Sequence, residues 1–585
     1  MFKLIKENIN KNKIKLFILL LILILIQVYL DLKVPDYMSK ITALIINEKS
    51  TLESILKEGL YMSLCALGSL TSAIFASYLV ALISSHFAMN LRSKLYQKVL
   101  SFDLENSKKF TTGSLVTRST SDVSQMEMFL AMGIQMLIKA PITALWAIFK
   151  ILNKGWEWSL LTAGSVLILI IIIFILFSLA IPKFRLVQIL LDKINNLIRE
   201  NLIGVRVIRA FNAEEFQEKK FQKENKKLLH NQLFTSKIMS LFTPTTYFIM
   251  YILTISIYFM GAILIDQAGM VKRITIFSNM IVFSTYAVHI IMSFVMLSII
   301  FLIYPRASVS AKRIKEVLKE EKKIKEGNFK GETKVVGEIE FRNVSFKYPD
   351  SEEYVLEKIS FKVKKGETLA IVGRTGSGKS TILELILRFY DVNEGEIFID
   401  GVNIKDYKLE ELYRKIGYVP QKPVVFTGTI KDNICYGKNN KKKDLDIHKA
   451  IQIAALWDFV FKERKGLDSK VAREGTNVSG GEKERLQIAR AILKNPEIYM
   501  FDDSFSALDY KTDLQVRQSL KEHLKDSTLL IVASRIGTIK NAEQILVIEE
   551  GKVQGKGTHE ELLKNCSIYQ DIFCSQFDLS KVKHE

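Results

Sequence analysis

Six long apolar stretches in the first half of the chain constrain its fold more than any other feature. They cover residues 14–32, 60–86, 130–152, 159–182, 241–265 and 274–304. About 20 apolar residues in a helix cross the hydrocarbon core of a bilayer, so each stretch is long enough to span a membrane. Six of them in one half exceed what a soluble domain buries. The sequence therefore predicts an all-α membrane domain with six spans over residues 1–318.

Charge sets the expected orientation of these spans. The lysines at the N-terminal end of the chain are Lys3, Lys6, Lys11, Lys13 and Lys15. Basic residues favour the cytoplasmic side, so we expect both termini in the cytoplasm and segments 153–158 and 266–273 outside. The inner segment 183–240 is basic, and residues 185–240 are expected to form two helices with a break near 211–213. The net charge of +20 then fits the cytoplasmic face of a membrane, and it requires no nucleic-acid partner.

The sequence pattern changes after residue 318. Residues 319–337 are a charged linker, and beyond it short β-like runs at 338–346, 368–373 and 527–533 alternate with helical stretches. This alternation predicts a soluble α/β domain with a largely parallel sheet over residues 338–585. The four cysteines are scattered along the chain and offer neither zinc-ligand spacing nor a disulfide framework.

The strongest chemical motif of the α/β domain is a glycine-rich loop. Residues 373–380 read GRTGSGKS, and they lie between an apolar strand at 368–372 and a helix. Glycines let backbone N–H groups close around phosphate oxygens at the positive end of the helix dipole. In this pattern Lys379 is expected to reach the β- and γ-phosphates and Ser380 to ligate Mg²⁺.

A second apolar strand, at residues 498–502, ends in Asp502. An apolar run that ends in Asp is by itself an ordinary strand end. Next to the glycine-rich loop, however, Asp502 is the natural carboxylate partner of the same Mg²⁺.

The order of four motifs resembles the ATPase domain of ABC proteins. These motifs are the loop 373–380, the stretch VSGGE at 478–482, the strand 498–502 and the stretch SALD at 506–509. With six spans ahead of it, the whole chain resembles a half-size ABC exporter of the multidrug type, with a type I exporter membrane domain. The resemblance implies ATP and Mg²⁺ as ligands, ATP-driven transport as the activity, and a second half-transporter subunit as the partner.

The resemblance also implies site residues. Tyr348 would stack on adenine, Gln421 would touch Mg²⁺ and the attacking water, and the signature residues 479–481 would bind the γ-phosphate of ATP held by a facing subunit. The residues it places on the nucleotide are Tyr348, Gly373, Arg374, Thr375, Gly376, Ser377, Gly378, Lys379, Ser380, Thr381, Ser479, Gly480, Gly481, Glu482, Asp502 and Asp509. It places Ser380, Gln421 and Asp502 on Mg²⁺, and it makes Asp503, Gln421 and Ser534 the catalytic positions.

Three positions depart from the family pattern. Asp503 stands where Glu is usual, Ser534 where His is usual, and Glu482 where Gln is usual. An aspartate retracts the carboxylate by about 1.5 Å against a narrow hydrogen-bond window, and a hydroxyl cannot carry charge as an imidazole does. These departures favour a heterodimer in which this chain's own phosphate loop forms the weakened ATP site. Harmless variation around an active homodimeric exporter or lipid flippase is the alternative.

The transported substrate is less constrained by the sequence. Lipophilic or drug-like compounds and lipids are the expected classes. Lys139 and His289 are ionisable residues within predicted spans and therefore candidates for a substrate cavity, although Lys139 can equally snorkel and His289 can bond a neighbouring carbonyl. An ATP-gated channel or a non-transporting regulatory subunit is the alternative of another class.

Overall fold

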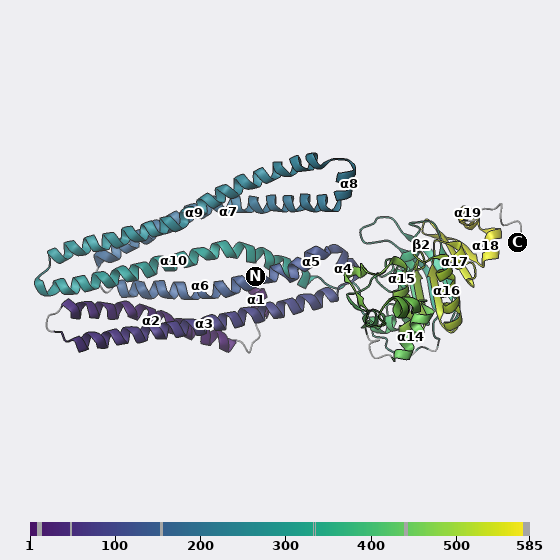
Figure 1. Ribbon diagram of the computed structural model, residues 1–585, viewed down its shortest axis with the longest axis horizontal. Helices are drawn as coiled ribbons and strands as arrows, with labels where there is room; N and C mark the ends of the chain where they lie inside the picture. Colours follow the sequence, from purple (N-terminus) through teal and green to yellow (C-terminus); the bar gives the residue numbers. More distant parts are fainter. Residues whose placement is uncertain are drawn as a thin grey trace. The chain divides into compact units, whose positions relative to one another are not determined.

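The computed structural model describes residues 1–8, 14–46, 50–152, 156–331, 333, 335–437 and 443–576, and it forms two compact units (Figure 1). The helical unit comprises Met1–Leu100 and Thr111–Glu320. The α/β unit comprises Ser101–Phe110 and Glu321–Glu585. Lys11, Lys13 and residues 153–155, which the sequence analysis used for orientation, lie outside the described residues.

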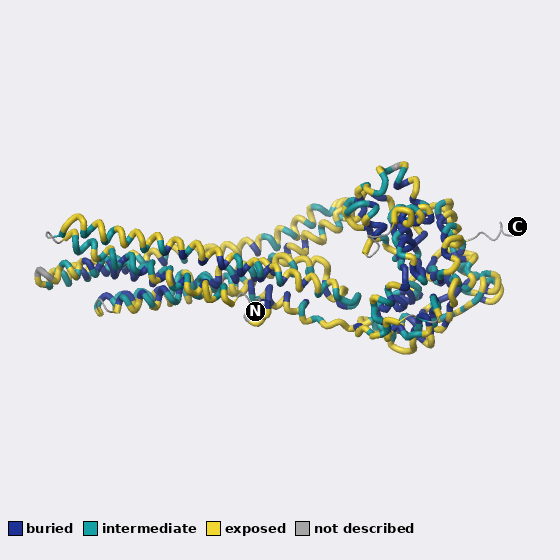
Figure 2. Tube along the Cα trace, turned by 90° about the horizontal axis from the view of Figure 1, so that it is seen from below, coloured by how far each residue is buried: buried dark blue, intermediate teal, exposed yellow. Residues whose placement is uncertain are grey.

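The helical unit contains six helices within the described residues that are long and apolar enough to cross a membrane, as predicted. Its helices are α1 (Phe2–Asn8), α2 (Ile14–Ile46), α3 (Leu52–Leu100), α5 (Thr112–Ser119), α6 (Ser121–Leu152), α7 (Trp156–Ile203), α8 (Val205–Ala210), α9 (Glu214–Asp266) and α10 (Met270–Lys319). Helix α2 packs along α3, α6 along α10, and α7 along α9. Exposed residues follow these helices along their length (Figure 2), and they include large apolar side chains such as Phe174 and Phe259. Lipid is the natural solvent for such faces.

The predicted break near residues 211–213 is confirmed, and a second break precedes it. Helix α7 ends at Ile203, and the short α8 lies between Gly204 and Phe211. A Cβ at Gly204 would lie 3.2 Å from the carbonyl oxygen of Glu200. The return of the chain from α7 to α9 therefore uses a short helix rather than one tight turn.

Charged residues inside the helical unit form ion pairs that the sequence analysis did not foresee. Lys139 Nζ lies 3.5 Å from Asp31 Oδ2, and the hydroxyl of Ser69 donates to the same carboxylate. Lys150 Nζ lies 2.6 Å from Asp36 Oδ2. The pairing with Asp31 satisfies Lys139 in low dielectric, so its charge is not by itself a sign of a substrate site.

A second hydrogen-bonded group lies close to these pairs. The hydroxyl of Tyr286 donates at 2.7 Å to Asp36 Oδ1 and lies 2.9 Å from the carbonyl oxygen of Leu32. The side chain of His289, the other ionisable candidate, is half-buried. Polar contacts therefore join α2 to α6 and α10 at several levels.

The α/β unit is built on two sheets. The parallel strands are β3 (Thr368–Val372), β6 (Ile416–Val419), β9 (Ile498–Asp502), β10 (Thr528–Val532) and β11 (Gln544–Glu549), in the order β11-β3-β10-β9-β6, and β12 (Lys552–Gly557) adds an antiparallel edge. The second sheet is antiparallel, in the order β2-β1-β4-β5, and consists of β1 (Ile339–Phe346), β2 (Leu356–Val363), β4 (Glu394–Ile399) and β5 (Val402–Asn403). The predicted parallel core is thus confirmed, and the antiparallel sheet is an addition to it.

Short helices surround the two sheets. They are α4 (Leu104–Lys109), α11 (Lys379–Ile386), α12 (Leu409–Lys415), α13 (Ile430–Ile434), α14 (Asp444–Ile453), α15 (Gly480–Lys494), α16 (Tyr510–His523), α17 (Ile536–Ile539), α18 (His559–Asn565) and α19 (Ser567–Gln576); the strands β7 (Gly428–Thr429) and β8 (Lys470–Val471) form a separate pair. The five parallel strands of the large sheet are almost wholly buried, and all five residues of β9 are; the edge strand β12 is not.

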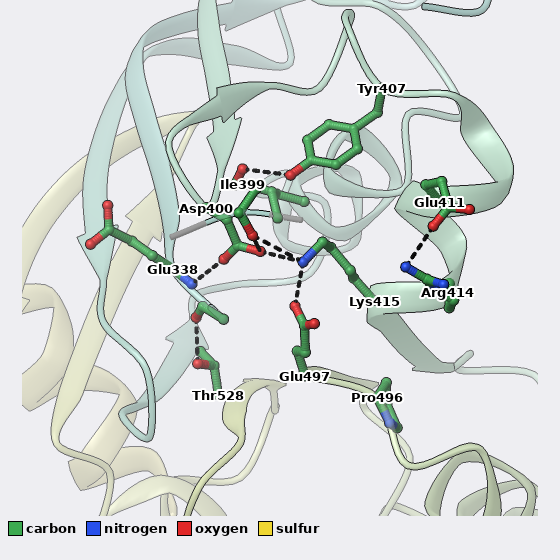
Figure 3. A network of polar contacts seen from close by, with 12 residues as sticks. Glu338, Ile399, Asp400, Tyr407, Glu411, Arg414, Lys415, Pro496, Glu497 and Thr528 are labelled. Atoms are coloured by element: carbon green, nitrogen blue, oxygen red, sulfur yellow. Dashed lines mark hydrogen bonds and ion pairs between the residues drawn. The ribbon is translucent and has the colours of Figure 1, made fainter. Parts of the chain in front are cut away.

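A buried ionic group joins the two sheets (Figure 3). Lys415 Nζ lies 2.7 Å from both Asp400 Oδ2 and Glu497 Oε2. The other oxygen of Asp400 accepts the backbone N–H of Glu338 at 2.9 Å. Burial opposes the charged ammonium, but the two carboxylates prevail and raise the pKa of Lys415. The group ties the end of β4 to the residue before β9, the strand that carries Asp502.

Candidate functional site

The glycine-rich loop joins β3 to α11 in the predicted strand–loop–helix order. Gly376 and Gly378 have φ angles of 86° and 96°, which L side chains rarely adopt, so glycine is required at both positions. The ammonium of Lys379 folds back over the loop and donates to the carbonyl oxygens of Gly373 at 2.9 Å and Arg374 at 2.8 Å. The ammonium of Lys379 is therefore held against the backbone at the start of the loop.

The side chains of the loop fit a phosphate group and a metal ion. The buried hydroxyl of Ser377 has no hydrogen-bond partner within the described part of the chain, and a phosphate oxygen would supply one. Ser380 Oγ donates at 2.9 Å to Asp502 Oδ1, so the two predicted Mg²⁺ ligands already lie together. Hydroxyl and carboxylate oxygens are the ligands that Mg²⁺ prefers.

Burial sets the electrostatics of this group. It lowers the pKa of the Lys379 ammonium, with nearby carboxylates opposing the shift. It raises the pKa of the Asp502 carboxyl, against the hydrogen bond from Ser380. Both residues therefore bear charges that an Mg²⁺–phosphate ligand would stabilise.

Two of the three unusual residues contact each other. The hydroxyl of Ser534 donates to Asp503 Oδ1 at 3.1 Å, and the backbone N–H of Ser534 lies 3.4 Å from the same oxygen. Asp503 itself has a φ of 46°, in the left-handed region. Its carboxylate is therefore held against β10 by the residue that replaces the usual histidine.

Tyr348 and Gln421 lie in different surroundings. The Tyr348 hydroxyl donates at 3.0 Å to Glu384 and lies 3.0 Å from the hydroxyl of Thr381, both on α11. Burial is the main cause that raises the pKa of Tyr348 to about 12. The side chain of Gln421 is exposed after β6.

The signature residues form the start of α15. Ser479 is the N-cap: its hydroxyl accepts the N–H of Glu482 at 3.4 Å, and its own N–H donates to Glu482 Oε2 at 2.7 Å. A Cβ at Gly480 would meet no atom closer than 3.8 Å, so packing within this chain does not require glycine there. The unusual Glu482 therefore completes a capping box, and Gly480 leaves the helix start open to a ligand.

Glu484 is a further residue of this region, which the sequence analysis missed. It is 4% exposed, and its carboxylate accepts the backbone N–H of Ala507 at 3.2 Å. Burial raises the pKa of this carboxyl. An acid two residues after Glu482 was the available signal, but sequence alone did not show that it turns inward.

Asp509 has a local structural role in this structure. Its carboxylate caps α16 and accepts the N–H of Thr512 at 3.0 Å. Together with the contact of Glu484 to Ala507, this cap fixes the segment 506–509 beside the signature residues.

Segment 101–110 is a further part of the site region. In sequence it lies between membrane helices, yet it belongs to the α/β unit. The ammonium of Lys108 lies 5.1 Å from the ring centroid of Tyr348. No motif pointed to Lys108, because the contact depends on where α4 packs.

Comparisons with known proteins agree with these motifs. Residues 17–293 match the family described as the ABC transporter transmembrane region, and residues 356–506 match the family described as ABC transporter. An uncharacterised ABC transporter ATP-binding protein of Mycobacterium tuberculosis is 35% identical over 547 residues, which are 92% of this chain and 93% of the relative. An ATP-dependent lipid A-core flippase of Pseudomonas fluorescens is 31% identical over 497 residues, 84% of this chain and 81% of the relative.

A solved structure gives the same fold. A bacterial Atm1-family ABC exporter with ATP bound superposes with a TM-score of 0.82 at 21% identity, over 96% of this chain and 99% of that one. The extent of these matches, together with the six spans and the phosphate loop, shows that the chain belongs to the ABC transporter family, as a half-transporter whose transmembrane region is fused to an ATP-hydrolysing domain.

Proposed function

We propose that this chain exports lipophilic compounds or lipids across the cytoplasmic membrane as one subunit of a heterodimer. Both termini lie in the cytoplasm, as the N-terminal lysines favour. The observation that carries the proposal is the hydrogen bond between Ser380 and Asp502 beneath the phosphate loop. It brings together the two groups that Mg²⁺–ATP requires. The names of the lipid A-core flippases among the relatives favour lipids as one substrate class.

Each ATP site is shared between two subunits in this proposal. Lys379 binds the β- and γ-phosphates, Tyr348 stacks on adenine, and Gln421 contacts the metal and the attacking water. Bound Mg²⁺ neutralises phosphate charge. The signature segment of the facing subunit binds the γ-phosphate of ATP on this chain. The Ser479–Gly481 start of this chain's α15 does the same for ATP on the partner, and the open position at Gly480 leaves room for it. Closure on ATP shifts the membrane helices toward an outward-open state, and hydrolysis resets them.

The contact between Asp503 and Ser534 supports a weakened site in this chain. The carboxylate of Asp503 already accepts a hydrogen bond from Ser534, and the aspartate side chain is about 1.5 Å shorter than that of glutamate. It is therefore poorly placed to orient water. This chain's signature would complete the competent site of an unlike partner. A homodimeric exporter or flippase would need Asp503 to serve as it stands.

Reconstitution of the full chain tests the proposal. We expect little ATP hydrolysis from the chain alone and strong hydrolysis when it is reconstituted with the half-transporter encoded beside its gene. Strong hydrolysis by the lone chain, abolished by Asp503→Asn, would establish the homodimer instead.

Transport assays separate the exporter from a channel or a regulatory subunit. In inverted vesicles, we expect uptake of lipophilic cations or lipids that follows ATP turnover. Flux that needs ATP binding but not turnover would identify a channel, and an absence of flux with normal ATP binding would identify a regulatory subunit.

A further inference from the structure

Helix α4 is held against the linker by a set of polar contacts within the α/β unit. Asp103 Oδ2 accepts the backbone N–H groups of Lys323 at 2.7 Å and Ile324 at 3.1 Å. Asn106, 1% exposed, donates at 2.9 Å to the carbonyl oxygen of Glu321. These bonds fix the position of α4 along the linker, and therefore the position from which Lys108 extends.

The ammonium of Lys108 lies over two tyrosine rings. Its Nζ is 5.1 Å from the ring centroid of Tyr348 and 5.3 Å from that of Tyr390. The two rings meet edge to face, with centroids 5.3 Å apart and planes at 87°. A cation within about 6 Å of a ring centroid is attracted by the negative face of the ring. Lys108 is therefore a point of attachment between α4 and the aromatic pair.

The ring of Tyr348 is contacted on several sides. Its hydroxyl bonds to two side chains of α11, and its ring meets those of Phe346 and Tyr390 edge to face, with centroids 5.1 Å and 5.3 Å apart. The ring also borders a cavity of about 270 Å³ that Asp103 lines as well. Lys108 adds the contact from α4, the cation over the ring.

We propose that Lys108 is a positioning residue for the nucleotide base: it holds the Tyr348 ring for stacking and links occupancy of the base site to α4. The inference rests on the proposed function, which places adenine on Tyr348. Linkage between two sites is reciprocal, so a lysine that favours base binding also makes base binding favour the docked α4. Segment 101–110 follows α3 directly in the chain, so the base, and not only the phosphates, has a path toward the membrane helices.

The test compares a ligand with a base to one without. Purified full chain in lipid nanodiscs is titrated with Mg²⁺–ATP and with Mg²⁺–tripolyphosphate, each competing with a fluorescent ATP analogue. We expect Lys108→Met to weaken ATP binding about three- to tenfold and to leave tripolyphosphate binding unchanged. Lys108→Arg, which keeps the cation, is expected to restore ATP binding to within about twofold of wild type.

The chain supplies a matched control in the neighbouring residue. Lys109 lies 5.9 Å from the ring of Phe110, so Lys109→Met removes a cation over a ring that is not the base platform. We expect it to change neither affinity. Equal weakening of both ligands by Lys108→Met, or no weakening of either, would overturn the inference.

Hydrogen–deuterium exchange tests the link to α4. ATP is expected to slow exchange of the peptide 101–110 in the wild type and not in Lys108→Met, while tripolyphosphate slows it in neither. Equal ATP protection in both proteins would overturn the link. If the wild type binds no ATP at all, the proposed function fails; if it prefers ATP to tripolyphosphate and Lys108→Met keeps that preference, only the present inference fails.

Discussion

The nucleotide-binding residues of this chain form a phosphate half and a signature half, and these differ in where their buried charged side chains lie. In the phosphate half, formed by 373–380, Asp502, Asp503 and Ser534, charged groups are buried enough to shift the pKa values of Lys379 and Asp502. In the signature half, formed by 479–484 and 506–509, the start of α15 is exposed, and the charge that burial affects is that of Glu484, one turn further along the helix. Each half nevertheless gives its unusual residue a partner within the chain, Ser534 for Asp503 and Ser479 for Glu482. The hydrogen-bond partner of an unusual residue therefore indicates what that residue does in this chain.

Removal of the loop cation gives the largest expected effect. Lys379→Ala takes away the ammonium that lies across the phosphate loop, so we expect ATP to bind to the chain alone about hundredfold more weakly. The measurement is titration of the purified chain with Mg²⁺–ATP, with an unchanged melting temperature as the control. Binding within about tenfold of wild type would mean that the phosphate half of this chain does not hold the nucleotide.

Restoration of the usual catalytic pair is expected to have the next largest effect. The double variant Asp503→Glu with Ser534→His returns a longer carboxylate and an imidazole, and we expect hydrolysis at this site to rise about tenfold or more. Because the two side chains are in contact, the single variants should together give less than the double variant. A double variant no faster than wild type would show that the phosphate half is not weakened by these residues.

Neutralisation of Glu482 tests the signature half. Glu482→Gln keeps an oxygen that accepts the Ser479 N–H but removes a negative charge from a predicted γ-phosphate site. We expect the ATP concentration for half-maximal hydrolysis to fall about threefold.

The control for Glu482 is a second capping box of the same kind. Thr558 donates its N–H to Glu561 at 2.8 Å at the start of α18. Glu561→Gln therefore makes the same chemical change away from the signature, and it should leave the ATP dependence unaltered. An equal shift in both variants would assign the effect to overall charge.

The buried Glu484 predicts a smaller effect on stability. Burial raises its pKa in the folded chain, so the folded state holds this proton to higher pH than the unfolded state does. Stability should therefore decline as pH rises from 4.5 through the raised pKa. Glu484→Gln, which keeps an acceptor for Ala507 and does not titrate, should flatten that decline.

Thermal unfolding of the two proteins across this pH range measures the difference. Glu484→Ala is the informative contrast, because it leaves the Ala507 N–H without its acceptor and should destabilise the chain by about 1–3 kcal/mol at every pH. If the stability of wild type and of Glu484→Gln changed in parallel with pH, Glu484 would not be the cause of the decline.

The sequence predicted the features that repeat or follow strict patterns. Six apolar stretches, the strand before Gly373 and the strand ending at Asp502 all appear where hydropathy and motif spacing place them. It did not predict the antiparallel sheet, whose strands alternate buried and exposed residues irregularly because β1 carries register shifts in both pairings.

Contacts between distant residues were beyond sequence reasoning. Lys139 was recognised as an intramembrane cation, but its partner Asp31 lies on another helix 108 positions earlier in the chain. The contacts of Lys108 with Tyr348 and of Glu484 with Ala507 likewise depend on how elements pack. A single sequence reports periodicity along the chain, and it does not report which side chains meet.

The assignment of residues 101–110 to the α/β unit bears on how this protein can be dissected. Leu104 from that segment and Phe329 from the linker both pack against the hydrophobic core that β1, β3 and α11 form. A soluble fragment that starts at residue 338 would leave their places in that core uncovered and lose the bonds that Asp103 and Asn106 make to the linker. Such a fragment would be less stable and more prone to aggregate than the ATPase domain of the intact chain, and measurements on it would reflect that difference.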